Sequence, residues 1–204
     1  MASQENLIRN MGIMQNGEID IFLGAGASIG SGIPTGQDMV WYFKRKLYCT
    51  ENKISEEKFK DAKLPSTQKL FQKYFDSQDG YPSLYDPTEY SFYFEKCYDN
   101  DLSRQRFIEQ SVVRHNPSIG YLCLAEMIIQ GRIKNIWTTN FDSLPETAIN
   151  ILEPQQELLV CSSVNSDNIN NFNPSYPCIC KLHGDFRYGK LQNTSEELQK
   201  IEYK

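Results

Sequence analysis

Three short clusters of polar residues carry the side-chain types from which a binding or catalytic site could be built. A glycine-rich run occupies residues 24–32, Thr139-Asn140-Phe141-Asp142 follows later in the chain, and His183-Gly184-Asp185 comes last. A histidine imidazole titrates near neutral pH and can act as a general base. An asparagine amide both donates and accepts hydrogen bonds. Together these groups suit the activation of a weak nucleophile beside a polar ligand.

The glycine-rich run has the composition of a turn that holds phosphate groups. It follows a short apolar segment, residues 19–23, that predicts a strand, and it places four glycines within nine residues. Glycine lets a ligand approach the backbone closely, and a helix predicted over residues 37–49 would offer its free N–H groups to an anion. We therefore expect a diphosphate-bearing ligand here. The alternative is a turn that only packs a helix against a sheet.

The glycine-rich run does not match the strict dinucleotide fingerprint GxGxxG, because Ile29 stands where the third glycine belongs. A dehydrogenase would also need an acidic residue at the end of a second strand, about 20 residues further on. The chain continues there into charged helical sequence. A dehydrogenase is therefore not implied.

The order of predicted strands and helices indicates the α/β class. Strands are predicted over residues 19–23, 132–139, 157–164 and 178–182, and helices over residues 119–130 and 144–152 lie between them. This alternation predicts a Rossmann-like parallel sheet flanked by helices. Ligands of such sheets bind beyond the carboxyl ends of the strands, where each of the three polar clusters lies. We expect the clusters to meet at one edge of the sheet.

Residues 50–116 differ in character from the rest of the chain. Charged and aromatic residues dominate this stretch, and its aromatic residues recur at helical spacing, which predicts an inserted helical module. Further helices are predicted over residues 1–16 and after Thr194, where Thr194 and Glu197 have the spacing of a capping box. The whole chain, residues 1–204, is expected to form one domain that carries this insertion.

The charge and hydropathy of the chain exclude some classes of partner. The formal net charge of −5 argues against a general nucleic-acid-binding surface. No run of about 18 apolar residues predicts a membrane span, and the first residues do not resemble a signal peptide. These observations predict a cytoplasmic protein that does not bind membranes or nucleic acid.

The six cysteines are expected to be reduced and mostly buried, because the chain shows no secretion signal. Cys178 and Cys180 would share one face of a strand, so a metal pair is conceivable there. No CxxC pair exists to complete a tetrahedral zinc site. We therefore expect no metal.

Taken in order, the three clusters resemble the sirtuin family, the silent-information-regulator type of NAD-consuming enzyme. Sirtuins carry GAGxS, SGIP, a TQNxD turn and an HG step, and this chain reads GAGAS at residues 24–28, SGIP at 31–34, TTNFD at 138–142 and HG at 183–184. The TTNFD spelling and the KLHGDF of residues 181–186 look like the divergent sirtuin-like domains of bacterial antiviral defence proteins. Those domains hydrolyse NAD+.

The resemblance implies a role for each matching residue. Asn140 would orient the nicotinamide ribose or the attacking water, Asp142 would hold the nicotinamide carboxamide, and His183 would be the general base. NAD+ would be the substrate, and its binding residues would be Gly24, Ala25, Gly26, Ala27, Ser28, Ile33, Pro34, Thr139, Asn140, Asp142 and His183. A carboxylate of Asp142 or Asp185 could stabilise an oxocarbenium-like transition state.

Each cluster also has a purely structural interpretation. A histidine at the end of a strand often only makes a hydrogen bond, residues 140–142 would form a good turn and helix cap, and Ser28 and Thr139 could be caps. The other histidine, His115, is expected to be solvated or to cap a helix. Convergence of the clusters at one edge of the sheet favours a nucleotide site over these interpretations.

Departures from true sirtuins leave two alternatives to NAD+ hydrolysis. The paired CxxC zinc module is missing, and Gly36-Gln37 replaces the Phe-Arg of the deacylases, so a protein deacylase is disfavoured. The other alternative is a non-catalytic module that only senses NAD+ or ADP-ribose. The resemblance further implies that a GxSxxD-like turn lies beyond residue 204. Since an enzyme that depletes NAD+ must be held inactive until needed, we expect regulation by assembly, as a homo-oligomer or with a partner defence protein, or by a C-terminal sensor.

Overall fold

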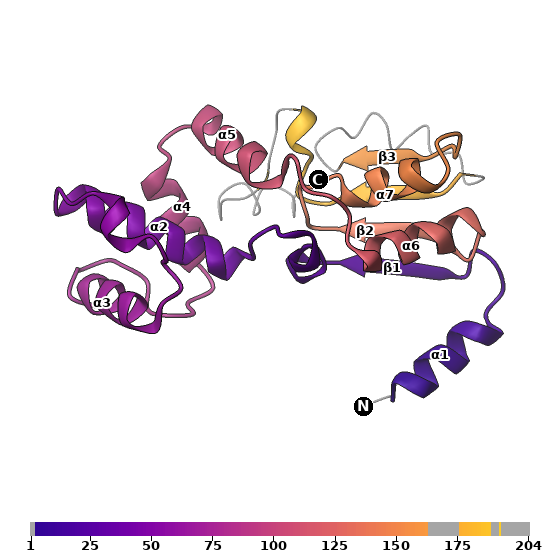
Figure 1. Ribbon diagram of the computed structural model, residues 1–204, viewed down its shortest axis with the longest axis horizontal. Helices are drawn as coiled ribbons and strands as arrows, with labels where there is room; N and C mark the ends of the chain where they lie inside the picture. The colour runs from indigo at the N-terminus through magenta and orange to yellow at the C-terminus, as the bar shows by residue number, and fades with distance from the viewer. Residues whose placement is uncertain (1–2, 163–175, 189–191, 193–204) are drawn as a thin grey trace. The chain divides into compact units, whose positions relative to one another are not determined.

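The computed structural model describes residues 3–162, 176–188 and 192, and these residues belong to two compact units (Figure 1). The first unit comprises the described residues of Met1–Ile33 and Val112–Leu191, and the second comprises those of Pro34–Ser111 and Gln192–Lys204. The elements of the first unit are α1 (Gln4–Ile13), β1 (Ile19–Leu23), the 3-10 helix η1 (Ala25–Ser31), α6 (Ile119–Ile129), β2 (Ile133–Thr138), α7 (Leu144–Leu152), β3 (Leu159–Ser162), β4 (Cys178–Lys181) and η4 (Phe186–Tyr188).

The first unit is built on a four-stranded sheet in which all neighbouring strands are parallel. The strand order is β1-β2-β4-β3, so β4 lies between β2 and β3. Leu23, Thr138 and Lys181 occupy matching positions at the carboxyl ends of β1, β2 and β4. The predicted α/β class and the Rossmann-like parallel sheet are therefore confirmed.

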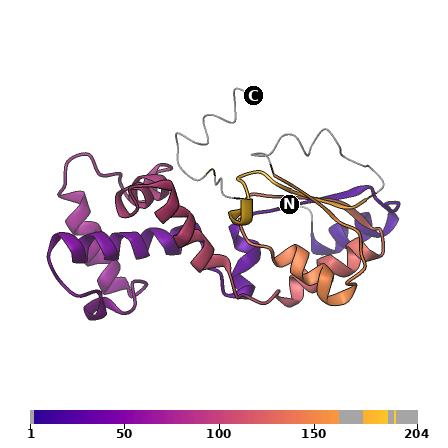
Figure 2. The same ribbon diagram turned by 90° about the horizontal axis from the view of Figure 1, so that it is seen from above.

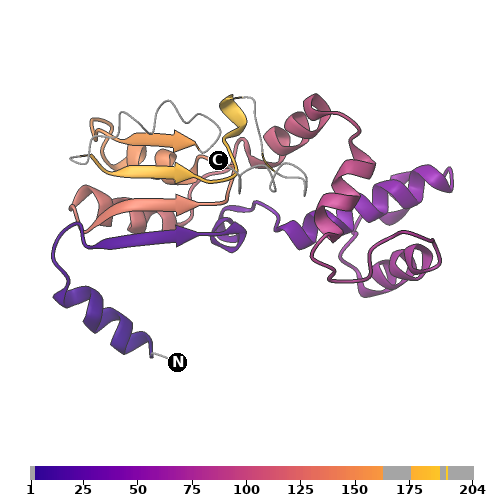
Figure 3. The same cartoon turned by 180° about the vertical axis from the view of Figure 1, so that it is seen from behind.

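The two faces of the sheet differ in what covers them. Helices α6 and α7 pack side by side on one face, as Figure 2 and Figure 3 show from above and from behind. Residues such as Ile136 and Ile179 point to this face and are fully buried. Phe22 and Trp137 lie at matching positions on the opposite face and are 64% and 39% exposed. The core of this unit therefore lies between the sheet and helices α6 and α7.

Local sequence signals explain where α6 and α7 begin and end. Ser118 is the N-cap residue of α6, and Gly131 follows the helix with a φ of 71°, a left-handed conformation that favours glycine. Pro145 lies in the first turn of α7, where a missing backbone N–H costs nothing. The bounds of both helices agree with the predicted residues 119–130 and 144–152 to within one residue.

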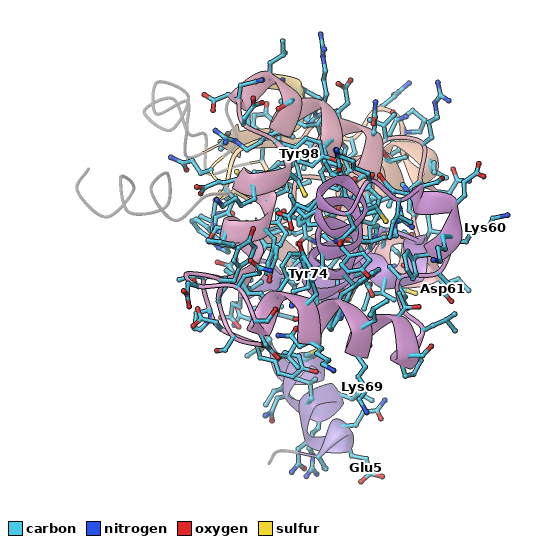
Figure 4. All side chains as sticks on the ribbon, turned by 90° about the vertical axis from the view of Figure 1, so that its left-hand side faces the viewer. Glu5, Lys60, Asp61, Lys69, Tyr74 and Tyr98 are labelled. Atoms are coloured by element: carbon cyan, nitrogen blue, oxygen red, sulfur yellow. The ribbon has the colours of Figure 1, made fainter. Side chains whose placement is uncertain are left out.

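The second unit is helical and has an aromatic core. It contains α2 (Gly36–Glu51), the 3-10 helix η2 (Glu56–Phe59), α3 (Pro65–Asp76), α4 (Glu89–Cys97) and α5 (Asp101–Val112), whose last residue falls in the first unit. Phe43 and Tyr93 are fully buried, and an ion pair between Lys44 and Glu89 is buried with them. Lys60, Asp61 and Lys69 are exposed at the periphery of this unit (Figure 4).

The helix after the glycine-rich run departs from the prediction. Its bounds, Gly36–Glu51, agree with the predicted residues 37–49, but it belongs to the helical unit. Thr35 and Asp38 form a capping box at its start, in which each side chain accepts a hydrogen bond from the other's backbone N–H. The Asp38 carboxylate already places a negative charge at the amino end of the helix, which disfavours a second anion there. The expectation that this end faces a bound anion is therefore not supported.

Other predicted segments agree with the structure within a few residues. The predicted helix at residues 1–16 is α1, and the predicted strand at residues 132–139 is β2. The strand predicted over residues 157–164 is described as far as Ser162. The loop predicted over residues 165–174 and the helix predicted after Thr194 lie outside the described residues.

Candidate active site at the carboxyl edge of the sheet

Strand β1 is followed by the 3-10 helix η1, and hydrogen bonds from His115 and Ser118 hold the end of η1 in place. The Nδ1 atom of His115 lies 2.9 Å from the carbonyl oxygen of Ser31, and the backbone N–H of Ser118 donates to the Ser31 hydroxyl at 2.9 Å. Gly32 ends η1 with a φ of 84°. The predicted phosphate-binding turn is therefore a short fixed helix, and His115 supports its end.

Ser28, Asn140 and Asp142 form one buried hydrogen-bonded cluster. The Ser28 hydroxyl donates to Asp142 Oδ2 at 2.7 Å, and Asn140 Nδ2 donates to the Ser28 hydroxyl at 3.1 Å. Asn140 Nδ2 also donates to the carbonyl oxygen of Gly24 at 3.0 Å. Since a carbonyl oxygen can only accept, this bond fixes which way the Asn140 amide points. The first and second polar clusters of the sequence therefore meet at the ends of β1 and β2.

Asp142 also supports the amino end of α7. Its Oδ1 atom accepts a hydrogen bond of 3.1 Å from the backbone N–H of Leu144, the first residue of that helix. A carboxylate is favourable at a helix N-terminus because of the unsatisfied N–H groups there. Asp142 therefore joins the glycine-rich run to α7.

Tyr121, from α6, completes the cluster from the covered side of the sheet. Its phenol oxygen lies 2.9 Å from the Ser28 hydroxyl and the residue is 3% exposed. Burial, together with the nearby Asp142 charge, raises the pKa of Tyr121 to about 12. The phenol is therefore protonated at neutral pH and can donate a hydrogen bond.

A buried lysine connects the third polar cluster to the second. The Lys181 ammonium group donates to the carbonyl oxygen of Asp142 at 2.7 Å and pairs with Asp185 at 2.8 Å and Glu146 at 2.9 Å. Arg187 also pairs with Asp185 and Glu146. Burial alone would raise the pKa of Asp185, but hydrogen bonds from Arg187 and the charge of Lys181 outweigh it and lower the pKa to about 2. This network of two cations and two anions holds β4 and α7 together.

His183 follows β4 and lies near the second cluster. The centroids of its ring and the Phe141 ring are 6.4 Å apart, and the side chain is half-buried. Burial lowers the pKa of His183, so the neutral imidazole predominates at pH 7. A neutral imidazole can accept a proton, which is what a general base requires.

No contact or backbone conformation within the chain explains why residues 24 and 26 are glycines. A Cβ added at Gly24 or Gly26 would meet no atom within 4 Å, and neither residue has a positive φ. Gly32 differs, because its φ is positive and a Cβ there would lie 3.3 Å from the His115 ring. The folded chain therefore needs glycine at residue 32 but not at residue 24 or 26.

The predicted site residues fall into three groups. Gly24, Ser28, Asn140 and Asp142 are in direct contact. Thr139 adjoins them, since its backbone N–H donates to the Leu23 carbonyl oxygen. Among the remaining predicted residues, Ala25 and Gly26 are exposed, Ala27 and His183 are half-buried, Ile33 is buried, and Pro34 begins the helical unit.

Sequence reasoning missed Lys181 and Tyr121 as parts of the site. Lys181 stands at the end of an apolar strand, and a charged residue in a buried strand is itself a signal of an ion pair. Tyr121 lies in a strongly apolar helix, and its sequence surroundings give no such signal. Ser28 was predicted to line a diphosphate site, but it is 1% exposed and its hydroxyl faces Asp142.

Comparisons with known proteins do not identify a family for this chain. The chain matches no model of a known protein family and no curated protein. No helix in the described segments is long and apolar enough to cross a membrane. Among the same residues, no group of three or more His, Cys, Asp or Glu side chains is arranged to hold a metal ion.

Proposed function

We propose that this chain is an NAD+ hydrolase domain that cleaves the bond between nicotinamide and ribose. NAD+ is the substrate, and the products are nicotinamide and ADP-ribose. The motif order supports this proposal, since it resembles the sirtuin-like domains of antiviral defence proteins. The proposed context is defence by depletion of NAD+ in the cytoplasm, with the activity restrained by self-association or by a partner protein.

The observation that carries the proposal is that no intramolecular contact explains the missing side chains of Gly24 and Gly26, next to a fixed polar cluster. Open space where the Cβ atoms of Gly24 and Gly26 would lie is what close approach of a diphosphate to the backbone requires. The amino end of η1 follows directly after Gly24 and carries backbone N–H groups. The diphosphate of NAD+ would lie against this backbone, and the buried Ser28 side chain would support the loop from behind.

Asn140 would position the reacting groups. Both hydrogens on its Nδ2 atom are engaged by Gly24 and Ser28, so Oδ1 is the atom that can accept a hydrogen bond from a ribose hydroxyl or from the attacking water. A fixed acceptor lowers the entropic cost of bringing water and sugar together. This role needs the orientation of the amide that Gly24 imposes.

His183 would take the proton from the attacking water. In the proposed step, the water oxygen bonds to the ribose carbon, the bond from that carbon to the pyridinium nitrogen breaks, and its electrons make nicotinamide neutral. The leaving group therefore needs no proton, and one base suffices. The negative charge of Asp142 would stabilise the positive charge that develops on the sugar.

Release of nicotinamide from NAD+ by the chain tests this proposal. We expect release from the wild-type chain, loss of release in Asn140→Ala and in His183→Ala, and unchanged release in Asn150→Ala. Asn150 is an exposed residue of α7 and serves as the matched control. NAD+ affinity, measured by calorimetry on the same samples, separates loss of binding from loss of chemistry.

Two outcomes would contradict the proposal in different ways. Binding of NAD+ without release under any condition would favour a sensing module. Release of acetyl groups from acetylated lysine peptides, at a rate exceeding NAD+ hydrolysis without peptide, would favour a deacylase.

A further inference from the structure

Three of the six cysteines gather on the face of the sheet opposite α6 and α7. Cys178 and Cys180 lie two residues apart in β4, and Cys161 lies beside Cys180 in the adjacent strand β3. The sulfur of Cys178 is 3.5 Å from the sulfur of Cys180 and 3.7 Å from the sulfur of Cys161. Cys178 therefore touches both other thiols and stands at the centre of the cluster.

The three thiols differ in their access to solvent. Cys178 and Cys161 are 1% and 7% exposed, whereas Cys180 is half-buried. Cys180 lies beside Trp137 of β2, which is 39% exposed on the same face. A small solute that reaches this face would therefore meet Cys180 before the other two thiols.

Contacts within the cluster favour the thiolate form of Cys180. The hydrogen bond between Cys178 and Cys180 lowers the pKa of the Cys180 thiol and outweighs the opposing effects of burial and of the Asp20 charge. The same contact raises the pKa of Cys178, which therefore stays protonated. Since a thiolate is the nucleophile in thiol oxidation, Cys180 is the residue of the cluster that reacts first.

Backbone geometry selects the pair that can form a disulfide. Neighbouring strands lie about 4.8 Å apart, so Cys161 and Cys180, which are register partners, fall within the range of about 4.4–6.8 Å between Cα atoms that disulfides require. Cys178 and Cys161 are displaced by two residues along the strands, which separates their Cα atoms by roughly 8 Å. Cys178 is therefore unsuited to bridging the strands.

We propose that Cys161 and Cys180 form a peroxide-sensitive disulfide site that links β3 to β4. The Cys180 thiolate attacks one oxygen of hydrogen peroxide, the O–O bond breaks, and Cys180 sulfenic acid and hydroxide form. The Cys161 sulfur then attacks the Cys180 sulfur, the S–O bond breaks, and the hydroxyl leaves as water with the Cys161 proton. The disulfide carries the oxidation that peroxide supplied, and a dithiol reductant reverses it.

Peptide mapping after peroxide treatment tests this site. The reduced chain is treated with hydrogen peroxide, its remaining thiols are alkylated, and it is digested without reductant. We expect a cross-linked peptide that joins Cys161 to Cys180, a loss of two of the six thiols, and recovery of both with dithiothreitol. In Cys161→Ser, oxidation should stop at a sulfenic acid on Cys180 that dimedone traps.

Two further variants keep the test independent of folding and of general thiol reactivity. Cys123 is an exposed thiol of α6, and Cys123→Ser should form the same cross-link as the wild-type chain. In Cys178→Ala, dimedone labelling of Cys180 should be slower, and thermal unfolding must show that the variant is folded. The proposal would be overturned if peroxide oxidised Cys123 while Cys161 and Cys180 remained free thiols and were alkylated. A disulfide that includes Cys178 would also overturn it.

Discussion

The hydroxyl of Ser28 lies 2.7 Å from Asp142 Oδ2, although 114 residues separate them in the sequence. Both side chains are buried, at 1% and 3% exposed. The bond joins the loop after β1 to the segment after β2. Asp142 thereby holds together two polar clusters that are remote in the chain.

Replacing Asp142 by asparagine should destabilise the protein while keeping its shape. Asp142 accepts from both the Ser28 hydroxyl and the Leu144 N–H, whereas an asparagine has only one accepting oxygen. Loss of one buried hydrogen bond costs about 1–3 kcal/mol. Urea unfolding of Asp142→Asn should show this loss, and nicotinamide release should fall with it. Asp86→Asn is the control, because the carboxylate of the half-buried Asp86 accepts its hydrogen bonds from Thr88, an exposed residue of its own turn.

The Lys181 ammonium group should matter far more to stability than that of an exposed lysine. Lys181→Met removes the cation between Asp185 and Glu146, and breaking a buried pair costs about 3–5 kcal/mol. Lys63→Met removes an ion pair with Asp38 that involves a side chain 63% exposed, which should cost about 0–1 kcal/mol. Urea unfolding of the two variants measures both. Equal midpoints for them would contradict the structural importance of the Lys181 network.

Two glycine substitutions separate folding from ligand binding. Gly32→Ala should destabilise the chain by about 1–2 kcal/mol, because an alanine at a φ of 84° is strained. Gly26→Ala should change stability by only about 0.5 kcal/mol, since its Cβ meets no atom within 4 Å. If the loop holds a diphosphate, Gly26→Ala should nevertheless weaken NAD+ binding. Unchanged affinity, measured by calorimetry, would remove the loop from the proposed site.

The fold was more predictable from the sequence than the site. Strand β1 and helix α7 match their predicted bounds, because Gly24 directly follows the apolar run of β1 and Pro145 lies in the first turn of α7. The unit to which α2 belongs could not be predicted. The spacing of the apolar residues in α2 fits packing against a sheet as well as packing against another helix, and in the structure α2 packs against α4.

For the site, the sequence predicted only which polar residues lie directly after the strands. Parallel pairing brings Leu23, Thr138 and Lys181 to one edge, so any polar residues directly after them become neighbours. Which atoms touch depends on side-chain packing that a strand pattern does not encode. Ser28 therefore proved to be a buried partner of Asp142, and Tyr121 reached the same cluster from a helix that looked purely apolar.

Acid should destabilise the first unit through Asp185. Its pKa is about 2 in the folded chain and 3.8 in the unfolded chain, so the unfolded chain binds more protons between these values. The stabilisation by Asp185 is fully present above about pH 4 and is lost as pH falls towards 2. Urea unfolding at a series of pH values should show this slope, and Asp185→Asn should reduce it. An unchanged slope in Asp185→Asn would assign the acid sensitivity to other carboxylates.

The pH dependence of nicotinamide release tests His183 as the base. Burial lowers the pKa of His183, so the neutral form persists to a lower pH than the ordinary value of 6.5 allows. A reaction that needs neutral His183 should therefore speed up as pH rises and level off with an inflection below 6.5. His115→Gln, which changes the only other histidine, should keep this inflection, whereas His183→Gln should lose it along with most of the rate. An inflection that survives in His183→Gln would assign proton transfer to another group and leave His183 a structural role.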